Sequence, residues 1–120
     1  MAIKVTAEML RERFKVTPEK MDQAIQILVK LYKPLKIYVF GSYARGQQDS
    51  GSDVDLMIVV PEFTAHPWEM ASQGYGSLSD VHMPVDLVLY DQVRFNQYCD
   101  NPTSFCSEII KTGRLLYEQS

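Results

Sequence analysis

The sequence predicts an α/β (α+β) fold in which helices pack on a small β-sheet. Three short β-rich runs, residues 36–40, 53–60 and 85–90, are each flanked by segments with helical character. Helices before, between and after short strands are typical of helices layered on one sheet. At 120 residues the chain has the length of one compact domain, so residues 1–120 are predicted to form a single unit.

Two helices are predicted before the first strand. Residues 6–14 form a short helix capped by Thr6. A longer helix starts after its cap Thr17, with Pro18 in the first position, and Pro34 ends it. One apolar stripe at helical spacing predicts the buried face of this longer helix. The stripe consists of Met21, Ala24, Ile25, Leu28, Val29 and Tyr32.

The middle of the chain contains the first two strands. Residues 36–40 are rich in β-branched and aromatic side chains, and Gly41 stops this run. A short helical segment is expected to start near Ser42, and residues 47–52 are predicted to form a polar loop. Pro61 closes the second strand.

The C-terminal half continues the alternation of helices and strands. A weak helix is predicted at residues 68–78, before the third strand. Residues 102–111 have helical character, and Gly113 would end that helix. Residues 114–117 either return as a strand or finish the helix.

Composition and charge argue against several classes of protein. The formal net charge is −3, so no clustered basic surface for duplex nucleic acid is expected. The longest apolar run, residues 56–61, is too short to cross a membrane, and the first residues lack the pattern of a signal peptide. Cys99 and Cys106 are predicted to be two reduced thiols near a helix, and the expected location is the cytoplasm.

Acidic residues interrupt two of the predicted strands. Because side chains alternate along a strand, Asp53 and Asp55 face the same side, about 6.6 Å apart between Cα atoms. Asp86 lies inside a core-like apolar run, residues 85–89. Buried or clustered carboxylates are costly unless a cation neutralises them, and oxygen ligands suit Mg²⁺. The sequence therefore predicts a magnesium site formed by Asp53, Asp55 and Asp86.

Each of these features has a plainer interpretation when taken alone. Asp53 and Asp55 would belong to an exposed strand start, Asp86 would form a salt bridge, and the Gly41–Ser42 pair would be an ordinary turn. In combination they favour chemistry, because a strand that ends in Gly-Ser before a short helix presents backbone N–H groups to phosphate. The spacing G-S-x10-D-x-D places this turn and the metal ligands on consecutive strands.

The stretch GSYARG…SDVDLMIVV resembles the signature of the DNA polymerase β-like nucleotidyltransferase superfamily. The short chain resembles its minimal nucleotidyltransferase (MNT) branch, which is similar to the catalytic core of kanamycin nucleotidyltransferase without a separate substrate-binding domain. The resemblance covers residues 36–91, the motif core. It implies a mixed sheet flanked by helices.

The resemblance also implies roles for individual residues. Gly41 and Ser42 would hold the triphosphate of ATP, the expected substrate. Asp53 and Asp55 would bind both of two Mg²⁺ ions, and Asp86 would complete one of the two sites. These three carboxylates are therefore the catalytic candidates as well as the metal ligands.

Two further residues near the motif are candidates for nucleotide binding. Arg45 either neutralises phosphate charge or pairs with Asp49 on the surface. Ser52 either caps or orients Asp53, or is a plain turn residue.

Many members of the MNT branch are encoded with a HEPN-domain toxin and act as its antitoxin, some by transfer of AMP to the toxin. The resemblance thus implies a Mg²⁺-dependent transfer of AMP from ATP to a hydroxyl of a HEPN partner. Two alternatives stay open: transfer to a small molecule such as an aminoglycoside, and an antitoxin that neutralises its partner sterically without catalysis. Assembly as a homo-oligomer or a hetero-oligomer is compatible with each.

Overall fold

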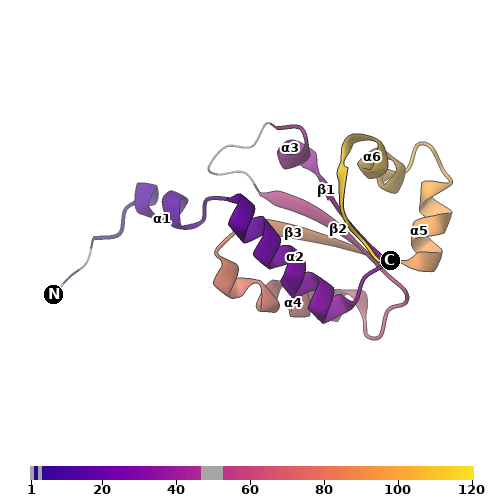
Figure 1. Ribbon diagram of the computed structural model, residues 1–120, viewed down its shortest axis with the longest axis horizontal. Coiled ribbons are helices and arrows are strands. Elements are labelled where there is room, and N and C mark those ends of the chain that lie inside the picture. The colour runs from indigo at the N-terminus through magenta and orange to yellow at the C-terminus, as the bar shows by residue number, and fades with distance from the viewer. Residues whose placement is uncertain (1, 3, 47–52) are drawn as a thin grey trace.

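The computed structural model describes residue 2, residues 4–46 and residues 53–120, and Figure 1 shows how the elements are arranged. The helices are α1 (Ala7–Arg13), α2 (Pro18–Tyr32), α3 (Gly41–Ala44), α4 (Pro67–Ser77), α5 (Gln92–Cys99) and α6 (Phe105–Thr112), with a short 3-10 helix, η1 (Ser79–Val81). The strands are β1 (Lys36–Phe40), β2 (Val54–Val60), β3 (Val85–Asp91) and β4 (Arg114–Glu118). Within this described part of the chain, no helix has the length and apolar character that crossing a membrane requires.

The described strands form one mixed sheet in the order β3-β2-β1-β4. β1 pairs antiparallel with both β2 and β4, whereas β2 and β3 run parallel. A parallel pair needs a crossover connection, and α4 lies in that connection because it follows β2 and precedes β3. The prediction of a mixed sheet flanked by helices is confirmed.

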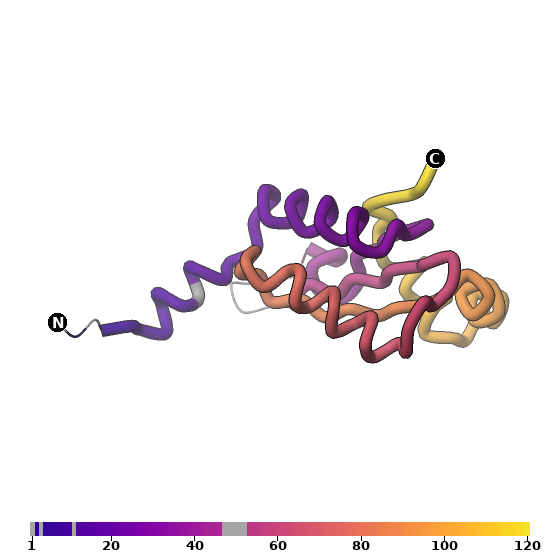
Figure 2. The backbone as a smooth tube through the Cα atoms, turned by 90° about the horizontal axis from the view of Figure 1, so that it is seen from below, coloured from indigo at the N-terminus to yellow at the C-terminus, as the bar shows by residue number. Residues whose placement is uncertain are grey.

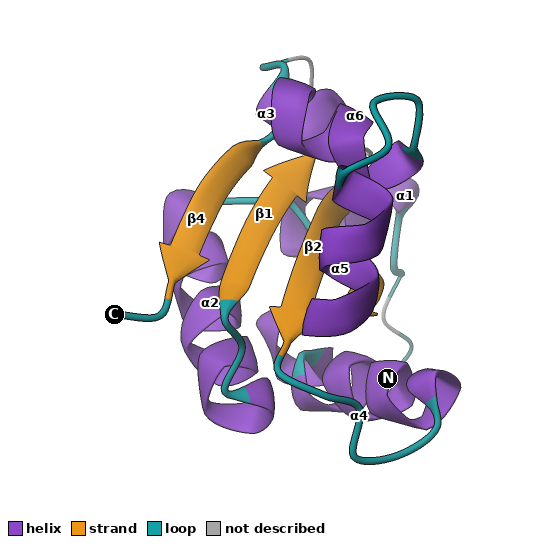
Figure 3. Ribbon diagram, turned by 90° about the vertical axis from the view of Figure 1, so that its right-hand side faces the viewer, coloured by secondary structure: helices purple, strands orange, loops and turns teal. Residues whose placement is uncertain are grey.

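Helices cover both faces of the sheet: α2 and α4 lie on one face, and α5 and α6 lie on the other (Figure 3). The first face buries most of the stripe predicted on α2 against one side of the central strands, whereas Ile25 and Val29 of that stripe are only partly buried. The fully buried residues on this face of the sheet and on α2 include Ala24, Leu28, Ile37, Val39, Leu56 and Ile58. On the second face, Met57 and Val59 of β2 pack with Phe95 of α5 and with Cys106 and Ile109 of α6. Apolar burial on both sides of β2 is therefore the main stabilising contribution to this sheet.

α1 lies outside these layers and extends away from the sheet (Figures 1 and 2). Thr6 caps α1 as predicted, and its hydroxyl accepts from the Met9 N–H at 3.1 Å. The base of this arm contacts the body, because the Phe14 ring meets the His82 ring edge-on with centroids 5.6 Å apart. Lys20 donates to the His82 carbonyl at 2.8 Å, which fixes the same junction.

Most element positions agree with the sequence prediction. Thr17 caps α2, β1 occupies the predicted residues, and residues 114–118 form a strand rather than the end of a helix. The sequence did not predict α5, although it begins with a clear signal. The Asp91 carboxylate accepts from the Arg94 N–H at 2.8 Å and caps this helix.

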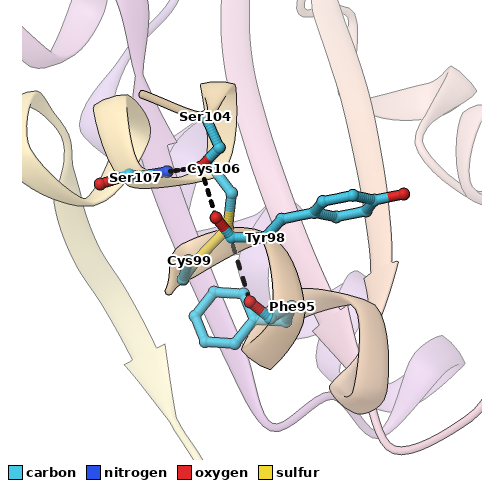
Figure 4. Close-up of a disulfide and its surroundings, with 6 residues drawn as sticks. All are labelled: Phe95, Tyr98, Cys99, Ser104, Cys106 and Ser107. Carbon is cyan, nitrogen blue, oxygen red and sulfur yellow. Dashed lines mark hydrogen bonds between the residues drawn. A yellow bond between two sulfur atoms is a disulfide. The ribbon is translucent and has the colours of Figure 1, made fainter. Parts of the chain in front are cut away.

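Cys99 at the end of α5 and Cys106 in α6 form a disulfide, so the prediction of two reduced thiols is wrong (Figure 4). The two helices pack together and bring the Cα atoms to 5.4 Å, within the range that a disulfide spans. The Ser104 hydroxyl, which caps α6, also donates to the Tyr98 carbonyl of α5. The sequence spacing of the cysteines fits no redox or metal motif, so only the helix packing reveals the pair.

Candidate functional site

The predicted carboxylates lie at the end of the sheet where β1 ends and β2 and β3 begin. Asp55 in β2 lies opposite Phe40 in β1 and opposite Asp86 in β3. Neighbouring strands are about 4.8 Å apart and paired residues share a face, so Asp55 and Asp86 are adjacent on one face. Asp53 is two residues before Asp55 and shares that face. Phe40 meets Phe105 of α6 with ring centroids 5.6 Å apart, which identifies it as the face of α5 and α6.

These carboxylates are more accessible than the sequence pattern indicates. Asp53 and Asp86 are exposed and Asp55 is half-buried, whereas Val54 and Leu56 are fully buried on the opposite face. The expectation that Asp86 is part of a buried, core-like run is therefore wrong, because the apolar packing of α5 and α6 lies further along the strands. The cluster is therefore only partly desolvated, and its charges lie close together.

Desolvation and the proximity of the charges together raise the pKa of two of the carboxyls. Desolvation raises the pKa of Asp55 above its ordinary value of 3.8, and the nearby charges of Asp86 and Asp53 raise it further. The positive charge of Arg45 acts in the opposite direction on the same carboxyl. The pKa of Asp53 is raised first by desolvation and then by Asp86. A cation among these groups would relieve the repulsion between their ionised forms.

Gly41 starts α3 directly beside this cluster. Its φ is 73°, in the left-handed region that favours glycine. A Cβ at this position would clash with the Asp55 carboxylate. The turn from β1 into α3 therefore lies next to the carboxylates, as a phosphate-binding turn would require, and Ser42 follows in the first turn of α3. The structure adds a reason for glycine here, since its missing side chain makes room for Asp55.

The remaining candidates lie on or after α3. Arg45 follows the last residue of α3, and its effect on the pKa of Asp55 places its charge near the carboxylates. Ser52 lies outside the described residues, and so does Asp49, the alternative partner of Arg45. The choice between the two roles of Arg45 thus stays a prediction.

The donor chemistry of the cluster suits Mg²⁺. Asp53, Asp55 and Asp86 offer only carboxylate oxygen, the ligand type that Mg²⁺ prefers. Within residues 2, 4–46 and 53–120, however, no group of three or more His, Cys, Asp or Glu side chains stands arranged to hold a metal ion. The exposed Asp53 and Asp86 can reach other rotamers without a change in the strands. The residues therefore fit the ion by the chemistry of their donor atoms, and the pKa shifts place Asp86 close to both Asp53 and Asp55.

A cavity of about 420 Å³ lies next to α3 and was not predicted from the sequence. Its lining residues are Pro18, Met21, Asp22, Ile25, Gln26, Tyr43, Arg114 and Leu116. Tyr43 belongs to α3, and the Arg114 guanidinium lies over its ring, 6.0 Å from the centroid. Because α2, α3 and β4 each contribute to the lining, no local sequence pattern indicates this cavity. It lies toward the α2 side of the sheet, away from the face of the carboxylates.

Known proteins with a similar fold were found among solved structures, whereas no curated protein matches the chain significantly. A Sulfolobus solfataricus protein described as a nucleotidyltransferase is 17% identical, with 99% of this chain and 93% of that chain covered and a TM-score of 0.56. A toxin–antitoxin MntA–HpeT structure is 23% identical, covering 82% of this chain and 73% of that chain, with a TM-score of 0.54. A toxin–antitoxin structure with AMP-PNP is 24% identical, covering 88% and 76%, with a TM-score of 0.53. At these identities the likeness concerns the fold.

The family is shown by a separate comparison. Residues 22–120 match the family model described as polymerase beta, nucleotidyltransferase. The match covers all the strands and every described helix except α1 and the first residues of α2. This chain therefore belongs to the polymerase β nucleotidyltransferase family.

Proposed function

We propose that this protein is a Mg²⁺-dependent nucleotidyltransferase of the minimal type, which transfers AMP from ATP to a hydroxyl of a HEPN toxin and so acts as its antitoxin. The observation that carries the proposal is the pairing of Asp55 with Asp86 on adjacent strands, beside the turn at Gly41. Nucleotidyl transfer depends mainly on positioning and charge neutralisation, and this arrangement can supply both.

Triphosphate binding is assigned to the start of α3. The backbone N–H groups at Gly41 and Ser42 and the Ser42 hydroxyl are suitable donors to phosphate. Arg45 would add positive charge near the same place, and Ser52 is kept as a further candidate. A likeness to a toxin–antitoxin structure with AMP-PNP supports an adenine nucleotide as the ligand.

The chain's own residues would carry out the following steps. Asp53, Asp55 and Asp86 would hold two Mg²⁺ ions, which would supply positive charge beside the triphosphate and the attacking oxygen. Asp86 would accept the proton of the acceptor hydroxyl. The acceptor oxygen then attacks the α-phosphorus, the bond to the pyrophosphate oxygen breaks, and pyrophosphate leaves. Gly41 and Ser42 would orient the phosphates for this in-line displacement.

The exposure of the carboxylates is compatible with a protein acceptor. Asp53 and Asp86 are exposed, so a side chain of another polypeptide can approach them. The fold likeness to the toxin–antitoxin MntA–HpeT structure supports a toxin as that polypeptide.

Co-expression with the adjacent open reading frame tests the proposal. The partner should co-purify and carry one or more additions of about 329 Da, the mass of an AMP group, by intact mass spectrometry. The modification should need ATP and Mg²⁺ when it is repeated with purified proteins.

The Asp86→Asn variant separates catalysis from steric neutralisation. A catalytic antitoxin would lose both the added mass and the neutralisation of its partner. A steric antitoxin would still neutralise the partner with no mass added, and that result would reject AMP transfer as the biological function. Transfer to an aminoglycoside but not to the partner would favour the small-molecule alternative.

A further inference from the structure

We propose that Tyr75 is a positioning residue for Asp86, acting through the backbone of Leu87. The proposal rests on the role of Asp86 proposed above. It assigns a function to a residue of α4, which lies on the opposite face of the sheet from the Asp86 carboxylate. Tyr75 does not touch the reacting atoms. It would set the orientation of the strand segment that carries the carboxylate.

Among the strands of residues 2, 4–46 and 53–120, β3 lies at an edge of the sheet, so half of its backbone groups face no other described strand. The Pro84 carbonyl accepts from the Val54 N–H of β2 at 3.0 Å. Backbone groups alternate in direction along a strand. The N–H and C=O groups of Asp86 therefore also point toward β2, and those of Leu87 point toward the free edge of β3. The Leu87 N–H donates to the Tyr75 hydroxyl at 2.9 Å. Tyr75 thus replaces the missing neighbour strand one residue after Asp86.

A glycine lets α4 approach the strand closely enough for this bond. A Cβ at Gly74 would lie 2.7 Å from the Leu87 side chain and would also clash with the Tyr32 hydroxyl. Tyr32 donates to the Met70 carbonyl of α4, and burial raises the pKa of Tyr32 to about 12. At neutral pH this hydroxyl therefore stays a donor. α4 is fixed to α2 through Tyr32 and to β3 through Tyr75.

The consequence for Asp86 follows from its place in the strand. The backbone of Asp86 pairs with β2 on one side. On the other side, the Leu87 N–H donates a hydrogen bond to the Tyr75 hydroxyl. Without the Tyr75 hydroxyl, the segment would be restrained on its inner side alone, and the exposed carboxylate would sample a wider range of directions. Loss of a hydrogen bond made directly to a metal ligand typically costs about 10–100-fold in metal affinity, and we expect the lower end of that range for this bond to the neighbouring peptide group.

The test compares Tyr75→Phe with Tyr98→Phe, a matched control on α5 whose side chain is about as exposed. The first readout is amide hydrogen exchange at Leu87 in metal-free protein, which should become about tenfold faster in Tyr75→Phe and stay unchanged in the control. The second is Mn²⁺ affinity in the presence of a non-hydrolysable ATP analogue, which should fall about tenfold in Tyr75→Phe only. In the transfer assay, kcat should fall while KM for ATP is retained.

Two results would overturn the positioning role. One is fast exchange of the Leu87 amide in the wild-type protein, which would mean that the bond does not form. The other is faster exchange in Tyr75→Phe with wild-type Mn²⁺ affinity, which would make the bond structural only. Failure of the wild-type protein to transfer AMP would reject the proposed function, and the Mn²⁺ affinities would still decide the role of Tyr75.

Discussion

The two halves of β2 present different chemistry on the same face of the sheet. Asp53 and Asp55 lie at the start of the strand, where they are accessible, whereas Met57 and Val59 are buried under α5 and α6. The alternation is the same along the strand, and the difference comes from what covers it. A strand can therefore contribute to the core at one end and to a charged site at the other. We call the end with Asp53 and Asp55 the open half of β2 and the end with Met57 and Val59 the covered half.

The opposite face shows no such division. Val54, Leu56, Ile58 and Val60 are all buried against the α2 side from one end of β2 to the other. The apolar residues of this face fix the register of β2, because a shift by one residue would bury the carboxylates. The site can thus tolerate repelling charges, since its position is determined by packing on the other side.

Asp55→Asn should have the largest effect on AMP transfer, because it removes the central charge of the open half and keeps the shape of the side chain. We expect AMP transfer to fall by a factor of about 1,000 or more. The unfolding free energy without Mg²⁺ should stay the same or rise, since a repelling charge is lost. Single-turnover transfer and urea unfolding measure the two effects. Transfer within tenfold of the wild-type rate would contradict the assignment.

Met57→Ala tests the covered half of the same face. Because Met57 is fully buried, its truncation should lower the unfolding free energy by about 2–5 kcal/mol in urea unfolding. Leu115→Ala on the edge strand is the control, and its cost should be much smaller since that side chain is 44% exposed. If Met57→Ala and Leu115→Ala lowered the unfolding free energy equally, the apolar residues between the sheet and helices α5 and α6 would not be packed as described.

Gly41→Ala probes the contact between α3 and the open half. The new Cβ would clash with Asp55 and would also strain a backbone with φ of 73°. Gly46→Ala is a matched control, because its φ is 70° but no described residue beyond its chain neighbours lies within 4 Å of a Cβ there. Strain alone should cost each variant about 1–2 kcal/mol of stability. A loss of ATP affinity is expected for Gly41→Ala only, and equal affinities in calorimetry would place the triphosphate elsewhere.

A smaller effect is expected in the pH dependence of stability. The pKa values of Asp53 and Asp55 are raised above 3.8 in the folded protein, so the folded state keeps these protons at pH values where the unfolded chain has lost them. In Mg²⁺-free buffer, the unfolding free energy should therefore fall as pH rises from about 4 through the raised pKa values. The slope in this window should be weaker in Asp55→Asn. If the unfolding free energy instead fell more steeply with pH in Asp55→Asn than in the wild-type protein, the Asp55 carboxyl would be stabilised as an anion, and the prediction would be wrong.

Local patterns in the sequence predicted much of this molecule. Thr6, Thr17 and the stripe on α2 define helices by capping and spacing, and the alternation in β2 predicted that Asp53 and Asp55 share a face. The pairing of Asp55 with Asp86 needs the strand order, which the residues alone do not contain.

Other features depend on how distant elements pack. The accessibility of Asp86 follows from where α5 and α6 end, and the Cys99–Cys106 bond follows from their contact. The bond between Tyr75 and Leu87 likewise needs the close approach of α4 to β3. Composition and periodicity describe one element at a time, so none of these could be predicted from them.

Nucleotide binding at the open half of β2 is proposed to depend on Mg²⁺. Calorimetric titration with a non-hydrolysable ATP analogue, with and without Mg²⁺, tests it most directly in the wild-type protein and in Asp55→Asn. We expect the wild-type affinity to be at least about tenfold higher with Mg²⁺, because the ion links the phosphates to the carboxylates. Asp55→Asn should lose most of this difference. Equal affinity with and without Mg²⁺ in the wild-type protein would show that the carboxylates do not bind nucleotide through the ion.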